Sequence, residues 1–244
     1  MTETMIEAAG ITKVLGEGAG RVDALKGIDL ALVGGELTLL MGPSGSGKTT
    51  LLSVLGCMLS PTGGSVRIRG HSTSGLGPEA LAMLRRQHVG FVFQSYHLFP
   101  TLTAAENVRL ALDVRGDRSA LARLRARDAL ATVGLADKAD AFPRELSGGQ
   151  QQRVAVARAI VGAPSVILAD EPTAALDSEN GHAVMTMLAE IAKDPARALF
   201  IVTHDPRIMP FAHRILRIED GRIVSDQRRS EQNGGAIRAL KVAS

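Results

Sequence analysis

The chain has 244 residues, a formal net charge of +3, 45% hydrophobic residues, 3% aromatic residues and a single cysteine, Cys57. This length suits one compact α/β domain, and one cysteine excludes an internal disulfide framework. The small charge and the few aromatic side chains argue against a nucleic-acid surface built from basic grooves and stacking rings. We therefore expect no nucleic-acid partner.

Membrane segments are not expected either. No apolar run approaches the roughly 18 residues that a membrane helix needs. The first residues, which include Glu3 and Glu7, lack the basic and apolar regions of a signal peptide. If the protein acts at a membrane, we expect another chain to cross it.

The predicted elements follow one another in an α/β order. Residues 24–41 read as strands, 49–59 as a helix, and 65–70 and 89–93 as further strands. From 95 to 162 the apolar positions recur three and four apart, which predicts helices at 102–114, 120–133 and 148–161 and no strand. Strands return at 165–169, 198–203, 214–219 and 222–225, and a helix at 179–193 joins the first two as a right-handed parallel crossover.

This order predicts one domain over residues 1–229. Its core comprises residues 1–94 and 163–229, and a helical subdomain of about 95–162 is inserted between them. Residues 230–244 read as a polar tail without fixed structure, in which a short helix at 236–242 is an option.

The pattern G-x-x-x-x-G-K-[ST] occurs at residues 42–49, between a predicted strand and a predicted helix. That context is typical of a phosphate-binding loop, since glycines let the backbone turn closely around an anion and the helix N-terminus points at it. Lys48 is expected to neutralise the β- and γ-phosphates, and the Thr49 hydroxyl to reach Mg²⁺. A flexible glycine–serine turn is the alternative, and it leaves the strand, lysine and helix unexplained. The residues expected to contact nucleotide are Gly42, Pro43, Ser44, Gly45, Ser46, Gly47, Lys48, Thr49 and Thr50.

Two acids, Asp170 and Glu171, end the predicted strand that begins near residue 165. An acid at the end of such a strand holds Mg²⁺, usually through water, in enzymes with this kind of loop, and Asp170 is our choice for that role. Glu171 lies one residue further, where a carboxylate can polarise an attacking water as a general base. Alone, the pair would equally fit solvated acids at a strand end; the phosphate-binding loop favours the catalytic interpretation.

Residues 146–150 open a helix and form a second candidate anion site. Ser147 is a natural N-cap, and Gly148 and Gly149 leave backbone N–H groups uncovered by side chains. One nucleotide cannot easily use both anion sites of one chain if the sites lie on separate lobes. Two chains arranged head to tail solve this, because each then closes over the nucleotide of the other.

Together with three further motifs, these features occur in the order that they have in the ABC ATPase family, and the sequence resembles that family over nearly its whole length. These motifs are Gln94 of the Q-loop, residues 174–177 of the D-loop, which end at Asp177, and His204 of the switch loop. The resemblance implies an α/β fold: a P-loop NTPase (RecA-like) core with an N-terminal antiparallel β subdomain and an inserted α-helical subdomain. It also implies ATP hydrolysis with ATP and Mg²⁺ as cofactors.

The resemblance further implies roles for individual residues. Glu171, His204, Lys48 and Gln94 would be catalytic, with His204 contacting the γ-phosphate and Glu171. Gln94 would link the Mg²⁺ and water site to the helical lobe, and it joins Thr49 and Asp170 around the metal. Across a homodimer, Asp177 and the signature residues would reach the ATP of the other chain. The signature residues are Ser147, Gly148, Gly149 and Gln150.

A finer similarity is to the lipoprotein-releasing and macrolide-exporter subfamily, through residues 42–52, 55–57, 89–94, 98–108 and 143–159. It implies a separate integral membrane permease as partner, at the cytoplasmic face of a bacterial inner membrane. An ATP-gated regulator that moves a permease-like partner without transport is the first alternative, and it differs only in the partner. An ABC ATPase acting on nucleic acid or ribosomes is the second, and it usually shows two cassettes or a long coiled-coil insertion.

The residue expected to contact the adenine base departs from the pattern of the family. Related ATPases stack an aromatic ring on adenine, yet no Tyr, Phe or Trp precedes Phe91, and Leu15 takes that place. Arg21 is an alternative platform through its guanidinium plane. We therefore expect weak base selectivity.

A contact with the membrane partner is also considered. Four residues near Pro100 either fill the helical lobe or form a groove for a short partner helix: Tyr96, Leu98, Phe99 and Leu102.

Overall fold

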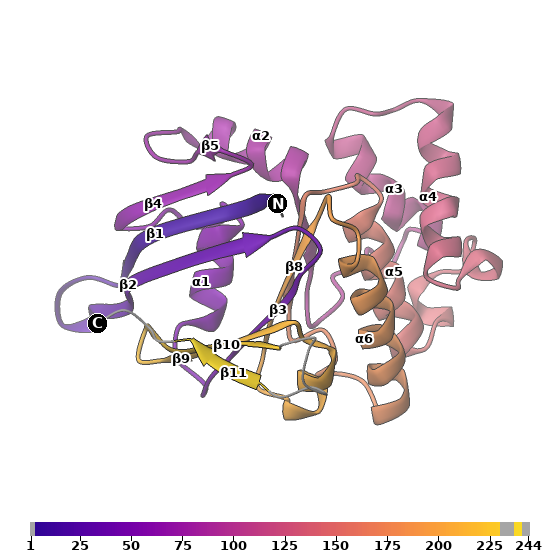
Figure 1. The fold of residues 1–244 in the computed structure, drawn as a ribbon. Coiled ribbons are helices and arrows are strands. Elements are labelled where there is room, and N and C mark those ends of the chain that lie inside the picture. The colour runs from indigo at the N-terminus through magenta and orange to yellow at the C-terminus, as the bar shows by residue number, and fades with distance from the viewer. Residues whose placement is uncertain (1–2, 230–236, 241–244) are drawn as a thin grey trace.

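Two β-sheets organise residues 3–229 and 237–240, which are the residues described by the computed structural model (Figure 1). The strands are β1 (Thr4–Leu15), β2 (Val22–Val33), β3 (Leu37–Met41), β4 (Gly63–Ile68), β5 (His71–Ser72), β6 (Val89–Val92), β7 (Val166–Asp170), β8 (Ala198–Thr203), β9 (Arg214–Glu219), β10 (Arg222–Arg229) and β11 (Ile237–Leu240). The α-helices are α1 (Lys48–Leu55), α2 (Pro78–His88), α3 (Ala104–Val114), α4 (Ala120–Thr132), α5 (Gly148–Ile160) and α6 (Ser178–Ala192). Short 3₁₀ helices are η1 (Gly18–Gly20), η2 (Ala136–Lys138), η3 (Pro143–Glu145) and η4 (Pro206–Phe211).

The first sheet is antiparallel and has the strand order β2-β1-β4-β5. It forms the predicted N-terminal β subdomain, but its longest pair of strands is only partly foreseen from the sequence. The pairing of β1 with β2 shifts register several times, including between Ala8 and Ile11, where Gly10 has a φ of 59°. Such bulges break the alternation of apolar and polar residues on which strand prediction depends.

The second sheet has the order β11-β10-β9-β3-β8-β7-β6, in which β9, β3, β8, β7 and β6 run parallel. Met41 lies beside Thr203, and Asp170 lies beside Val202. The carboxyl ends of these parallel strands therefore meet at one edge of the sheet, which is where open α/β sheets place their ligands. The loops after β3, β7 and β8 all start there.

The core lies on both faces of the second sheet. On β3, Leu37 and Leu39 belong to the apolar cluster shared with α3, α5 and α6, whereas Leu40 belongs to the cluster shared with α1 and the first sheet. Helix α1 thus lies between the two sheets, with contacts to β1, β2, β7 and β8. A strand buried on both faces reads as a continuous apolar run, which explains the pattern of residues 37–41.

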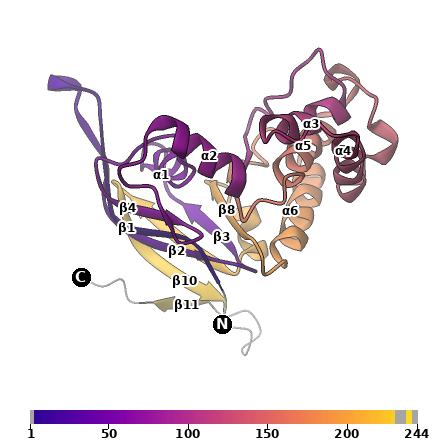
Figure 2. The same ribbon diagram turned by 90° about the horizontal axis from the view of Figure 1, so that it is seen from above.

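Helices α3, α4 and α5 form the predicted helical lobe. Residues 93–165, all of which are described, contain no strand. Both views show the three helices on one side of the molecule, away from the first sheet (Figures 1 and 2). Each helix begins at a side-chain cap, namely Thr103, Ser119 and Ser147. Helix α2 is not among the elements predicted above, and none of its residues is fully buried. Its ends do carry helix signals, namely Pro78 and Glu79 in the first turn and basic residues in the last.

Part of the tail is a strand. Residues 237–240 form β11, which pairs antiparallel with β10, so the optional helix at 236–242 is wrong for these four residues. The edge of β10 offers unpaired backbone N–H and C=O groups, and an added strand satisfies them. The other tail residues, 230–236 and 241–244, lie outside the described residues.

Within residues 3–229 and 237–240, no helix combines the length and the apolar character that crossing a bilayer requires.

A buried arginine fastens β9 to its surroundings. Arg214 is 8% exposed and makes two hydrogen bonds to the Asp226 carboxylate on β10, at 2.8 and 2.6 Å. It also donates to the Ala31 carbonyl at 2.7 Å, and Glu36 lies 3.9 Å away. Burying a charge is tolerated only when it is paired and hydrogen-bonded, and this arginine is both.

We predict that Asp226→Ala lowers the free energy of unfolding by about 3 kcal/mol, since it leaves a buried guanidinium short of its main partner. Urea denaturation followed by circular dichroism would measure the change. Glu190→Ala is the control, because its pair with Lys193 is about two-thirds exposed on both sides; it should cost less than about 1 kcal/mol. Equal small losses in the two variants would contradict the prediction.

Candidate active site

The phosphate-binding loop packs closely against the strands beside it. A Cβ on Gly42 would lie 2.1 Å from the Ile218 carbonyl oxygen, and one on Gly47 would lie 2.6 Å from that of Ala24. Gly47 also has a φ of 103° and is the residue before α1. Both positions therefore require glycine, because a side chain would push the loop away from the sheets.

The loop curls around the side chain of Lys48. The Lys48 Nζ donates hydrogen bonds to the carbonyl oxygens of Gly42 and Pro43, each at 2.8 Å. Lys48 opens α1, so its ammonium adds to the positive end of the helix dipole. The hydroxyl of Ser46 is buried and has no hydrogen-bond partner within the described chain. The cation and the helix N-terminus are the features that suit this loop to an anion.

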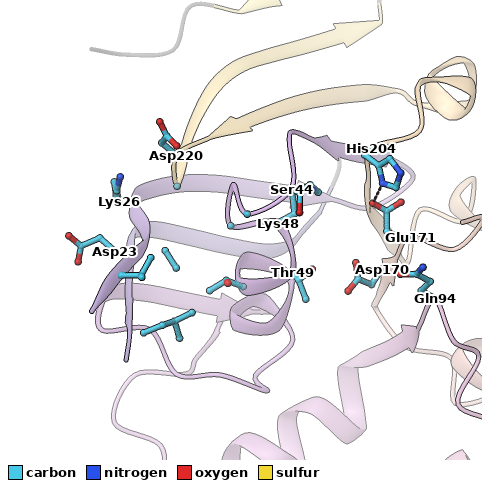
Figure 3. A pocket seen from close by; sticks show the side chains of 17 residues that line it. Asp23, Lys26, Ser44, Lys48, Thr49, Gln94, Asp170, Glu171, His204 and Asp220 are labelled. Carbon is cyan, nitrogen blue, oxygen red and sulfur yellow. Dashed lines mark hydrogen bonds and ion pairs between the residues drawn. The ribbon is translucent and has the colours of Figure 1, made fainter. Parts of the chain in front are cut away.

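The two acids leave β7 in different directions. Asp170 is the last residue of the strand, whereas Glu171 has a φ of 46°, an uncommon backbone conformation for a residue with a side chain. The Glu171 Oε1 lies 2.6 Å from the Nδ1 of His204, and its Oε2 accepts a hydrogen bond from the Thr203 hydroxyl at 3.0 Å. The predicted contact of Glu171 with His204 is thus present in the structure (Figure 3).

The environment of Asp170 favours a nearby cation. Burial raises the pKa of this carboxyl, and repulsion from Glu171 raises it further, while the Thr49 hydroxyl and the Lys48 charge act in the opposite direction. A bound cation would relieve both unfavourable effects. Among residues 3–229 and 237–240, no group of three or more His, Cys, Asp or Glu side chains could hold a metal by itself.

One cleft of about 740 Å³ collects most of the predicted residues (Figure 3). Those that line it are Leu15, Ser44, Gly45, Gly47, Lys48, Thr49, Thr50, Gln94, Asp170, Glu171 and His204. Gln94 enters from the loop after β6, two residues beyond the end of that strand. Gly42, Pro43 and Ser46 belong to the same loop but do not line the cleft.

Sequence reasoning missed the wall opposite the acids, which is formed by Val22, Asp23, Ala24, Lys26, Asp220 and Gly221. Val22 faces Leu15 across the β1–β2 hairpin, and the two side chains are 59% and 38% exposed. Arg21 does not line the cleft; it lies 4.0 Å from Asp23. Asp220 and Gly221 both have positive φ between two strands, and this Asp-Gly pair is a hairpin signal that gives no hint of a ligand.

The signature residues lie elsewhere. Ser147 accepts a hydrogen bond from the Gln150 N–H, and the Gln150 side chain accepts one from the Ser147 N–H, which completes a capping box at the start of α5. Ser147, Gly148, Gly149, Gln150 and Asp177 do not line the cleft. Asn180 of α6 joins this second group, since it binds Asp177 and lies 2.4 Å from where a Cβ on Gly149 would be.

Several known proteins are similar to this chain. The family model described as "ABC transporter" matches residues 25–174. Macrolide export ATP-binding/permease protein MacB 1 of Aeromonas hydrophila subsp. hydrophila is 46% identical over 229 residues, covering 94% of this chain and 35% of that protein. MacB of Salmonella typhimurium is 46% identical over 220 residues, covering 90% and 34%. The chain thus spans about a third of the length of these curated relatives.

Solved structures extend the similarity to the whole fold. The dimeric post-hydrolysis state of the ATP-binding cassette MJ0796, bound to ADP and Pi, has a TM-score of 0.84 and 41% identity, with 92% of this chain and 98% of that chain covered. CbiO1 from Clostridium perfringens, part of the ABC transporter complex cbiONQ, has a TM-score of 0.80 and 27% identity, with 92% and 88% covered. The predicted fold class, a P-loop NTPase core with an antiparallel subdomain and a helical subdomain, is confirmed. The chain belongs to the ABC transporter family, as one of its ATP-binding cassettes.

Proposed function

We propose that this cassette hydrolyses ATP as one half of a head-to-tail homodimer and uses that cycle to drive an integral membrane permease on a separate chain. The observation that carries the proposal is the position of Glu171. Its carboxylate, held by His204 at 2.6 Å, shares one cleft with the loop that folds around Lys48. A carboxylate suited to the role of general base and a loop suited to phosphate thus line one cleft, which supports nucleotide hydrolysis as the function.

The residues around Asp170 fit a Mg²⁺ ion. This ion takes oxygen ligands and uses one or two carboxylates together with the substrate phosphates. Thr49, Asp170 and Gln94 all line the cleft and bring a hydroxyl, a carboxylate and an amide oxygen. When bound, the ion would neutralise phosphate charge and offset the repulsion between Asp170 and Glu171.

Hydrolysis then requires little covalent chemistry from the protein. Lys48 and the N–H groups of the loop hold the phosphates, so that the γ-phosphorus faces Glu171. Glu171 accepts a proton as a water oxygen bonds to that phosphorus and the bond to ADP breaks, which gives ADP and phosphate. His204 would contact both Glu171 and the γ-phosphate, since it lines the cleft and its side chain is 71% exposed.

The second anion site supports a dimer. Ser147 caps a helix N-terminus that a phosphate could approach, yet it lies outside the cleft of its own chain. We propose that this surface and Asp177 close over the ATP of a second copy. The related cassette MJ0796 is itself described as dimeric, with ADP and Pi bound.

A groove between the helical lobe and the sheet offers a place for the permease. Its volume is about 420 Å³, and its apolar wall includes Phe91, Phe93, Leu110 and Val114. Phe99 stands at this groove and is 55% exposed, whereas Leu98 packs partly against the core. An exposed aromatic beside an apolar groove fits a short partner helix. We place the complex at the cytoplasmic face of a bacterial inner membrane, in line with the export permease function in the names of the MacB relatives.

We predict that Glu171→Gln binds ATP with near-native affinity but loses at least about 100-fold in turnover, because an amide cannot take the proton from water. An ATP-bound dimer should accumulate, since hydrolysis normally opens it. Phosphate release and light scattering with ATP would measure the two effects. Near-normal turnover would exclude Glu171 as the base.

Two further variants separate the binding of ATP from the closure of the dimer. Lys48→Ala should weaken ATP binding itself. Ser147→Arg, added to Glu171→Gln, should prevent the dimer while leaving ATP binding to the monomer intact, because a bulky cation would stand where the second chain approaches. Loss of ATP binding in the monomer would place Ser147 in its own chain's site.

For the permease, we predict that Phe99→Glu abolishes co-purification with the native membrane partner while the basal ATPase rate stays within about twofold of native. The substitution removes the aromatic contact to the partner helix, and a carboxylate there would lose its water when that helix covers the groove. Leu124→Glu is the matched control, because Leu124 is 57% exposed on the same lobe and does not line the groove. Equal loss in both variants would argue against the groove.

For the base, we predict that ATP and GTP differ by less than about tenfold in kcat/KM, because Leu15 and Val22 give apolar contact without a π-face. Stacking is worth roughly 1–3 kcal/mol per base in nucleic-acid complexes, so Leu15→Tyr should lower KM for ATP with little change in kcat. Steady-state kinetics with both nucleotides would test this. Leu76→Tyr, at a site also 38% exposed but outside the cleft, should change neither constant. A strong native ATP preference that Leu15→Tyr leaves unchanged would contradict the role of Leu15.

A further inference from the structure

The hydrogen bonds of Thr203 fix the direction in which its hydroxyl group donates. Thr203 ends β8 and is fully buried. Its Oγ1 accepts a hydrogen bond from the Asp205 N–H at 3.0 Å and donates one to the Glu171 Oε2 at 3.0 Å. Because a hydroxyl carries a single proton and the Asp205 N–H can only donate, the proton of Thr203 is directed to the carboxylate.

Glu171 is otherwise held by backbone geometry and by His204. Its N–H donates to the Val202 carbonyl at 2.9 Å, and its φ of 46° is an unfavourable conformation that persists only where the surroundings enforce it. His204 binds the other carboxylate oxygen, Oε1, at 2.6 Å. Three consecutive residues at the end of β8 thus fix the backbone and both oxygens of Glu171.

The loop that carries the Asp205 N–H is itself anchored. The Asp205 carboxylate accepts hydrogen bonds from the N–H of Arg207 at 2.9 Å and from its Nε at 3.0 Å. The Arg207 Nη1 donates to the hydroxyl of Ser178, at the start of α6, at 3.0 Å. The Asp205 N–H, which donates to the Thr203 hydroxyl, is therefore held in place by these hydrogen bonds.

We propose that Thr203 is a positioning residue for hydrolysis, which holds the Glu171 carboxylate in the orientation that receives the proton of the attacking water. It does not touch the reacting atoms, and its role rests on the proposed function, in which Glu171 is the base. A glutamate side chain without this bond keeps its link to His204 but gains freedom about its last torsion, and small misplacements of a reacting group cost large factors in rate.

The test compares Thr203→Val, which keeps the shape and removes the hydroxyl, with Thr203→Ser, which keeps the hydroxyl. We expect Thr203→Val to lower kcat by about tenfold or more with KM for ATP within about twofold of native, and Thr203→Ser to retain kcat within about threefold. Circular dichroism checks that each variant folds; if the valine variant does not, Thr203→Ala replaces it. Native kcat without the hydroxyl, or failure of serine to restore the rate, would overturn the proposal.

A matched control isolates the effect from a general loss of stability. Thr38 on β3 is also a buried strand threonine, 1% exposed, and its hydroxyl donates to a carboxylate, Glu36 Oε1, at 2.7 Å. Thr38→Val should lower the melting temperature while kcat stays native. If the two valine variants lower kcat equally, Thr203 has only a structural role.

A double variant separates this proposal from the one it rests on. In single-turnover hydrolysis, Thr203→Val should cause no further loss when added to Glu171→Gln, because Thr203 acts through that carboxylate. Multiplicative losses would mean that Thr203 acts elsewhere and would overturn the positioning role. If Glu171→Gln alone keeps normal turnover, the assignment of the base fails, whatever the Thr203 variants do.

Discussion

The parallel register of β3, β8 and β7 is the constraint on which the site depends. Met41 lies beside Thr203 and Asp170 beside Val202, so the loops that follow these strands start at the same level. The phosphate-binding loop, the two acids and His204 reach one cleft for that reason, although more than a hundred residues separate the loop from the acids and from His204. The helical lobe can be inserted between β6 and β7 without disturbing this register, because both strands stay paired in the sheet.

Much of this arrangement could be predicted from the sequence. The apolar run before Gly42 and the run before Asp170 are strands buried on both faces, and such strands leave clear signals. The helices of the lobe carry capping residues and apolar stripes, and their predicted ranges agree with α3, α4 and α5 to within a few residues. The resemblance to the ABC ATPase family implied that Lys48, Glu171 and His204 work together, and all three line one cleft.

What escaped prediction depends on contacts between distant segments. The wall made by Val22, Lys26 and Asp220 comes from two hairpins, and nothing in their local pattern reports that they meet at the cleft. The irregular register of β1 breaks the alternation that strand prediction needs. Helix α2 was overlooked for a different reason, since its signals lie at its ends and none of its residues is fully buried. The bond from Thr203 to Glu171 joins residues 32 apart, and it becomes visible only once the strands are aligned.

Asn180 gives the molecule an internal linkage between its two lobes. Its side chain binds Asp177 at 2.7 Å and occupies the space that a side chain at position 149 would need. The N-terminus of α5, on the helical lobe, therefore rests on the N-terminus of α6, on the sheet side. If the lobe rotates, Gly149 either carries Asn180 with it or loses this contact. The glycine at 149 thus lets the two lobes touch at Asn180, the residue that binds Asp177.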